Sequence, residues 1–161
     1  MGTRKIGDWN KVHALIGNLA EEMYKAREMS LQRWGLKAEG IAKSHISKQD
    51  LGWEALKPET IASKVRKGQS ENILVASSSY FQSITSYVIK GVAYAGVKKE
   101  VKYADGTEVA DIAALHEFGS RSGDIPAREL WQPTFKETME WYTKSDHTPA
   151  KILKKNLKKY L

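Results

Sequence analysis

Apolar side chains recur at steps of three and four residues in the N-terminal part of the chain, from about Asp8 to Ile46. This spacing predicts a long amphipathic helix, with Asp8 or Asn10 as its N-terminal cap. Gly35 and Gly40 disfavour helix, so we expect either two helices or one long helix with a break there. Such a helix is longer than a small sheet needs for its own cover. Its far end therefore packs either on its own domain or on a partner, and the sequence leaves both open.

The composition is that of one globular domain with appendages. The chain has 161 residues and a mass of 18.1 kDa, and its 41% hydrophobic and 28% charged residues exclude a disordered chain and a fibrous repeat. No apolar run approaches the ~18 residues of a membrane span, and the start, MGTRKIGDW, lacks the apolar stretch of a secretory signal. Cysteine is absent, which removes disulfides and thiolate metal sites. We therefore expect a soluble, unexported protein with no membrane partner.

Two β-rich runs in the middle of the chain predict a hairpin. Residues 84–89 (ITSYVI) and 92–97 (VAYAGV) flank Lys90-Gly91, which suits a two-residue turn. The second run is apolar on both faces, so we expect the hairpin to be largely covered. Residues 99–103, followed by a turn at Asp105-Gly106, predict a further, more exposed strand edge.

Helices are expected before and after this hairpin. Pro58 begins a short one, residues 109–118 form another that Gly119 ends, and residues 130–142 form a third. Thr148-Pro149 opens a basic terminal helix. The predicted fold class is α+β: a small antiparallel β-sheet covered by helices, with a long N-terminal helix and a basic C-terminal helix. The predicted organisation is a helical segment (1–46), an α+β core (47–144), and a linker with a basic amphipathic helix (145–161).

The positive charge is concentrated at the C-terminal end. Lysine plus arginine minus acids is 26 − 19 = +7. Residues 151–161 contain five lysines and no acid, which leaves 7 − 5 = +2 for the other 150 residues. Such a run is either a solvated helix face or a contact to phosphates, an anionic membrane or an acidic protein. The candidate DNA or partner contacts are Lys151, Lys154, Lys155, Lys158 and Lys159.

No sequence motif demands catalysis. His116-Glu117 matches the start of a metalloprotease motif, but Ser120 stands where the second histidine is required. We therefore expect His116 to cap or hydrogen-bond at a helix end instead of binding a metal. Phosphate-binding loops and nucleophile elbows are also absent from the sequence. We predict a protein that is not an enzyme and has no cofactor and no metal; a hydrolase that uses His116 and Glu117 is a third hypothesis.

From Trp53 onward the order of motifs resembles the Mu-like virion morphogenesis or tail-completion proteins of tailed bacteriophages, which are related to head-tail joining and neck proteins. The resemblance covers roughly residues 50–142. Within it, the polar stretch Lys98 to Glu108 looks like a loop or hairpin added to the family's pattern. The matching stretches are Trp53-x-x-Leu56-x-Pro58-x-Thr60 followed by Lys64, Ile73-Leu74-Val75, Tyr80-Phe81-x-Ser83-Ile84, Val92 to Val97, Ala113-x-x-His116-Glu117-Phe118-Gly119 and Ile125-Pro126-Ala127-Arg128.

The last two motifs have a simple physical interpretation. Gly119 lets the chain leave a helix in a left-handed turn, Pro126 stiffens the loop, and Arg128 can pin it by bidentate pairing, for instance with Glu117. The same residues either close their own domain or present a rigid loop to a neighbour. The structural or interface candidates are Trp53, His116, Glu117, Phe118, Gly119, Pro126 and Arg128.

The resemblance implies a structural virion protein located in the tail or neck and assembled in the host bacterial cytoplasm. It implies a homo-oligomeric ring, commonly a hexamer, at the neck or the head-proximal end of the tail. The implied partners are other neck or tail proteins (connector, tail tube, sheath), with non-specific contact to packaged DNA. The alternative from the residues alone is a basic nucleic-acid-binding module that acts through the C-terminal helix.

Overall fold

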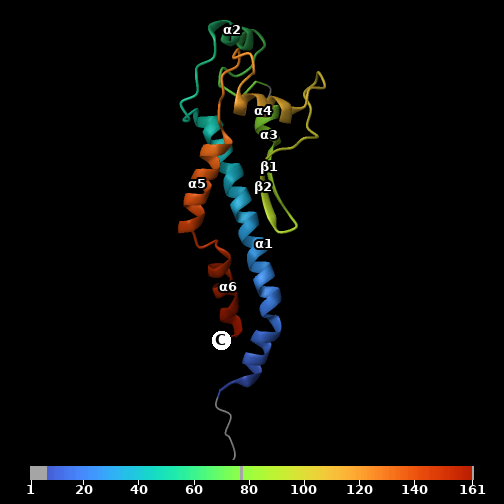
Figure 1. Cartoon of the computed structure of the whole chain (residues 1–161), viewed down its shortest axis with the longest axis vertical. Helices are drawn as coiled ribbons and strands as arrows, with labels where there is room; N and C mark the ends of the chain where they lie inside the picture. Colours follow the sequence, from blue (N-terminus) through green and yellow to red (C-terminus); the bar gives the residue numbers. More distant parts are fainter. Residues whose placement is uncertain (1–6, 77, 161) are drawn as a thin grey trace, which may run out of the picture.

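The structure is a computed structural model and describes residues 7–76 and 78–160. Residues 1–6 of the predicted N-terminal helical segment (1–46) and residue 161 of the predicted C-terminal segment (145–161) lie outside the described residues. Figure 1 shows an elongated molecule built along one helix. The fold is α+β, as the sequence predicts. In chain order the elements are α1 (Trp9–Lys48), α2 (Pro58–Arg66), α3 (Ser79–Ser83), β1 (Ile84–Ile89), β2 (Val92–Val97), α4 (Val109–Phe118), α5 (Trp131–Lys144), α6 (Pro149–Leu157) and the short 3-10 helix η1 (Lys158–Tyr160).

Helix α1 is continuous over 40 residues, which corresponds to a length of about 60 Å at 1.5 Å per residue. Asp8 caps it, accepting a hydrogen bond from the Lys11 amide at 3.2 Å. The expected break at Gly35 and Gly40 is wrong. Gly35 faces the hairpin, and a Cβ there would lie 3.1 Å from the Ser86 Cβ. This glycine therefore permits a close approach of two elements instead of interrupting the helix.

The hairpin forms with the predicted strand limits, and its register pairs Ile84 with Val97 and Tyr87 with Tyr94. One face packs on α1, while α5 and α6 lie on the opposite side of that helix (Figure 1). The other face, called the outer face here, is about half exposed, so the expectation of a largely covered hairpin is wrong. A single helix covers only one face of a two-stranded sheet. The outer face consists of Tyr87, Ile89, Val92 and Tyr94.

The stretch after β2 forms less structure than expected. The further strand edge is reduced to one isolated bridge, between Lys102 and Glu108. The predicted turn is present: Gly106 has a positive φ, and the Thr107 amide donates to the Asp105 carboxylate at 2.9 Å. Within the described residues the sheet therefore has two strands. The four shorter helices expected from the sequence correspond to α2, α4, α5 and α6.

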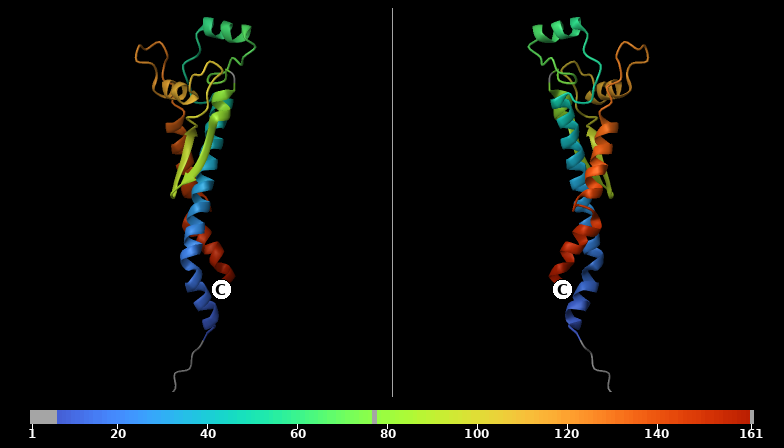
Figure 2. Two further views of the ribbon diagram at one scale, coloured as in Figure 1. Left: turned by 90° about the vertical axis from the view of Figure 1, so that its right-hand side faces the viewer. Right: turned by 90° about the vertical axis from the view of Figure 1, so that its left-hand side faces the viewer.

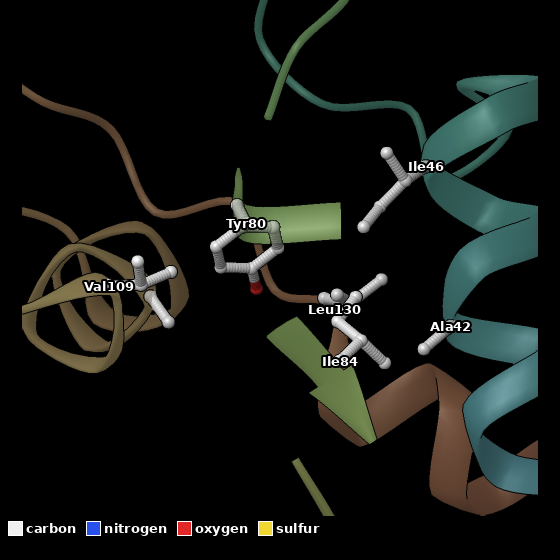
Figure 3. Packing of buried hydrophobic residues seen from close by; sticks show 7 residues of the cluster. Ala42, Ile46, Tyr80, Ile84, Val109 and Leu130 are labelled. Atoms are coloured by element: carbon white, nitrogen blue, oxygen red, sulfur yellow. The ribbon is translucent and has the colours of Figure 1, made fainter. Parts of the chain in front are cut away.

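The largest cluster of buried hydrophobic residues joins the C-terminal end of α1 to β1, α3, α4 and the start of α5, and Figure 3 shows how its side chains pack. Ile46 from the end of α1 meets Ile84 and Leu130, and all three are fully buried. Tyr80 and Val109 extend this cluster toward α4. We call the part that contains this cluster the head (residues 42–76, 78–84 and 97–130), and the remainder of the described chain the stem (residues 7–41, 85–96 and 131–160). The head contains the largest apolar cluster of the fold.

Apolar and polar contacts together hold the stem. Trp34 of α1 stacks on Phe135 of α5 with ring centroids 5.8 Å apart, and Ala26 and Ile152 are buried. Glu22 on α1, only 3% exposed, accepts from Lys159 at 2.7 Å, and this hydrogen bond lowers the pKa of Glu22. Ser30 joins α1 to α5 and to the α5–α6 connection, through the Tyr142 hydroxyl and the His147 carbonyl, both at 2.6 Å. None of the described helices combines the length and the apolar character that a membrane span requires.

Candidate functional site

The structural or interface candidates from Trp53 to Arg128 lie in the head, and six of the seven belong to α4 or to the segment that follows it, whereas the matching stretch Val92–Val97 forms β2. We call residues 119–127 the head loop; it projects sideways from the molecule (Figure 2). Trp53 packs against the core and donates from its indole nitrogen to the Glu129 carbonyl at 3.0 Å. Trp53 therefore links the chain after α1 to the chain after the head loop.

Glu117 holds the start of α5. Its carboxylate accepts from the Leu130 amide at 2.8 Å and from the Trp131 amide at 3.1 Å. These are amides at the helix N-terminus, where a negative charge is favourable. The expected pairing of Glu117 with Arg128 is wrong, because both carboxylate oxygens are already engaged by α5.

The head loop is closed at its base by short-range hydrogen bonds. The Ser120 amide donates to the Ile125 carbonyl and the Ile125 amide returns a bond to the Ser120 hydroxyl, both at 2.9 Å. The Arg128 amide donates to the His116 carbonyl at 2.6 Å. Gly119 leaves α4 with φ 76° and ψ 170°, a region that only glycine adopts readily. The positive φ at the end of the helix is as expected, but the extended ψ places Gly119 outside the left-handed helical region, and the stiffening by Pro126 stays a prediction.

Phe118 stands at the base of this loop with 82% of its surface exposed, the largest exposed fraction among the described large hydrophobic residues. It is the last residue of α4. Glu117 before it and Ser120 two residues after it both form hydrogen bonds, so the ring is presented from a backbone that is held on both sides.

Arg128 is buried without a carboxylate partner. It is 5% exposed, and its guanidinium makes one long hydrogen bond, to the Glu54 carbonyl at 3.4 Å. Its Nε atom is buried and has no hydrogen-bond partner within the described chain. Burial lowers the pKa of Arg128. The charge of Glu54 acts in the opposite direction, so Arg128 has a nearby acid but no direct ion pair among the described residues.

A cavity of about 420 Å³ lies between α2 and α4; we call it the head cavity. Its walls are mostly apolar, and Lys64, His116 and Asp105 add polar groups. The His116 side chain forms no hydrogen bond with the described residues, so the expected hydrogen-bonding role at a helix end is wrong. Burial first, and then the charges of Arg128 and Lys64, lower the pKa of His116. These effects favour the neutral form of the His116 side chain.

The geometry around His116 gives the hydrolase hypothesis no further support. Both Glu117 oxygens accept hydrogen bonds from amides at the start of α5, so the carboxylate is turned toward that helix. Among residues 7–76 and 78–160, no group of three or more histidines and carboxylates is arranged to hold a metal ion.

The C-terminal lysines separate into two sets. Lys159 pairs with Glu22, and Lys151 lies 3.1 Å from Asp146 and donates to the Ser145 carbonyl. Lys154, Lys155 and Lys158 form no ion pair within the described chain; with Arg33 they line a cleft of about 550 Å³ against α1. Lys151 and its partner Asp146 line the same cleft, so the unpaired cations there are those of the second set and Arg33.

Two surfaces were not predicted from the sequence. The outer face can be recognised only from the structure, which shows that α1 covers one side of the hairpin and leaves the other exposed. The head cavity is lined by segments that lie far apart in the chain. The spacing of Leu56, Lys64, Tyr103 and His116 carries no local signal that they share a cavity. Comparisons of this chain with models of protein families, with curated protein sequences and with solved structures find no match.

Proposed function

We propose that this chain is a non-enzymatic structural subunit that assembles in several copies into a ring at the neck or the head-proximal end of a tailed-phage tail. The ring completes the tail and joins it to the head. The proposal combines the motif resemblance of residues 50–142 with one structural observation, the amount of apolar surface that the fold leaves uncovered.

This uncovered surface has two parts. The first is the outer face, where Tyr87 and Tyr94 stack with their ring centroids 5.1 Å apart. The second is the N-terminal half of α1, where Ile16 is 65% exposed. Soluble monomers rarely expose such continuous apolar patches, whereas subunits of assemblies do. Exposed members of the second part are Trp9, Val12, Ile16, Met23 and Tyr24.

In this proposal the protein belongs to the virion and is assembled in the bacterial cytoplasm. Its partners are further copies of itself and the connector, the tail tube or a sheath. An elongated subunit in which stem and head expose separate surfaces can contact both a neighbour in the ring and the adjoining ring.

Replacing Tyr87 and Tyr94 together by serine is expected to shift the chain from a ring-sized mass toward the 18.1 kDa monomer. Loss of two stacked aromatic side chains from an interface weakens association by tenfold or more. The measurement is light scattering after gel filtration at several concentrations. Val65→Ser, which removes an exposed apolar side chain on α2, is the matched control and should assemble like the unaltered chain. A chain that is monomeric at every concentration and absent from purified particles would refute the proposal.

A second candidate function, non-specific nucleic-acid binding, is favoured by the unpaired lysines on α6 and η1. Replacing Lys154, Lys155 and Lys158 by glutamine is expected to weaken binding to duplex DNA and to reduce the slope of log K against log salt by about 2–3. The control replaces Lys98, Lys99 and Lys102, which are exposed in the head, and removes the same charge. Fluorescence anisotropy in a salt series measures both. Unchanged binding by the α6 variant would exclude this surface as the DNA site.

A further inference from the structure

The exposure of Phe118 has no explanation within one copy of the chain. Burying a phenyl side chain stabilises a protein by about 1.5–3 kcal/mol, and the exposed ring of Phe118 contributes no such stabilisation to the single chain. The backbone around it is held by hydrogen bonds of Glu117 and of the head loop. An aromatic ring presented in this way is the usual form of an interface anchor.

The head cavity has the size and the walls to receive such a ring. Its volume is about 420 Å³, while a cavity of about 150 Å³ suffices to bind benzene. The apolar side chains in its wall are Leu56, Leu74, Val75, Ile112, Tyr80 and Tyr103.

Ring and cavity lie on different sides of α4. Successive residues of an α-helix are 100° apart, so Phe118 points about 200° away from His116, which lines the cavity. In Figure 2 the head loop extends on the side of the head opposite to α2, which forms another wall of the cavity. The ring of one copy therefore cannot fill its own cavity. A contact between such non-identical surfaces is heterologous, the type that builds a ring when the rotation between successive subunits closes.

The charges beside the two surfaces are complementary. The head loop carries Arg121 and Asp124, both exposed, and the cavity carries Asp105 and Lys64. A docked loop can pair Asp124 with Lys64 and Arg121 with Asp105. Burial, and then the charge of Arg128, lower the pKa of Lys64, so a carboxylate placed beside it would relieve an unfavourable environment.

We infer that Phe118 of one copy inserts into the head cavity of the next copy, and that Asp124 and Arg121 of the inserted loop pair with charges at the cavity. The inference rests on the proposed function, since it requires that copies of the chain assemble. It adds the contact that links successive subunits.

The experiment uses two variants of the full chain that disable opposite halves of the contact. Phe118→Ser removes the inserted ring. Thr60→Trp, at an exposed position of α2 in the cavity wall, fills the cavity. Each variant alone is expected to self-associate at least 30-fold more weakly than the unaltered chain. An equimolar mixture is expected to give a 1:1 dimer of twice 18.1 kDa and nothing larger, because the dimer's outer ends are both disabled.

Circular dichroism melts of both variants control for unfolding, and Val65→Ser serves again as the surface control. Phe118→Ser assembling like the unaltered chain overturns the inference but leaves the proposed ring intact. A mixture that stays monomeric while each variant is folded overturns it as well. An unaltered chain that is monomeric at every concentration also overturns it, whereas the proposed function is then decided by whether purified particles contain the protein.

Discussion

Replacing Gly119 by alanine is expected to lower the free energy of unfolding by about 2–3 kcal/mol. Gly119 occupies a backbone region that costs other residues about 1–3 kcal/mol. In addition, an alanine Cβ would lie 3.1 Å from the Ala127 nitrogen and from the Ile125 oxygen, which are backbone atoms at the neck of the head loop. Since backbone atoms cannot rotate away as a side chain can, the two strands of chain at the base of the head loop must move apart. Urea denaturation monitored by tryptophan fluorescence measures the loss.

The matched control is Gly40→Ala. Gly40 lies within α1, and no atom lies within 4 Å of the position of a Cβ there. The same substitution should therefore stabilise the protein, by about 0.5–1 kcal/mol. Equal effects at the two glycines would contradict the role assigned to Gly119.

Glu117→Ala is expected to destabilise the fold by a similar amount, about 2–3 kcal/mol, because two amides at the start of α5 lose a charged acceptor. Leu130 and Trp131, which supply these amides, also belong to or pack against the core, so the loss reaches the centre of the head. Glu117→Gln keeps an acceptor oxygen and loses the charge, and should cost about half as much. Thermal and urea denaturation measure both variants.

Glu129→Ala controls for the removal of a carboxylate from the same segment. The Glu129 side chain is exposed, so its loss should change stability by less than about 0.5 kcal/mol. If Glu117→Ala were as mild as this control, Glu117 would not be the cap of α5.

Local patterns were sufficient to predict most of the secondary structure. Two β-rich runs around Lys90-Gly91 fix a hairpin, and Pro58 and Gly119 mark helix limits through backbone geometry alone. The same reasoning failed for Gly35, because a glycine that breaks an isolated helix also permits the approach of another element. Which of the two applies depends on the hairpin, 50 residues away in sequence.

The candidate site was predicted only in part. The motifs identified residues that do lie together in the head, but they suggested an ion pair between Glu117 and Arg128, the simplest match of opposite charges. The carboxylate instead binds amides, which carry no sequence signal, and Arg128 is left without a direct ion pair among the described residues. The head cavity and the outer face depend on tertiary packing, and periodicity contains no information about either.

Because the largest apolar cluster lies in the head, the two ends of α1 are held by different contacts. Its C-terminal turns, with Ile46, separate from the protein only if the core opens, whereas its N-terminal turns are held by contacts such as that of Glu22 with Lys159. Local opening of the stem then costs less free energy than global unfolding and leaves the core closed. In the proposed ring, neighbours that cover the N-terminal half of α1 would raise this cost, so that the subunit gains its full rigidity only on assembly.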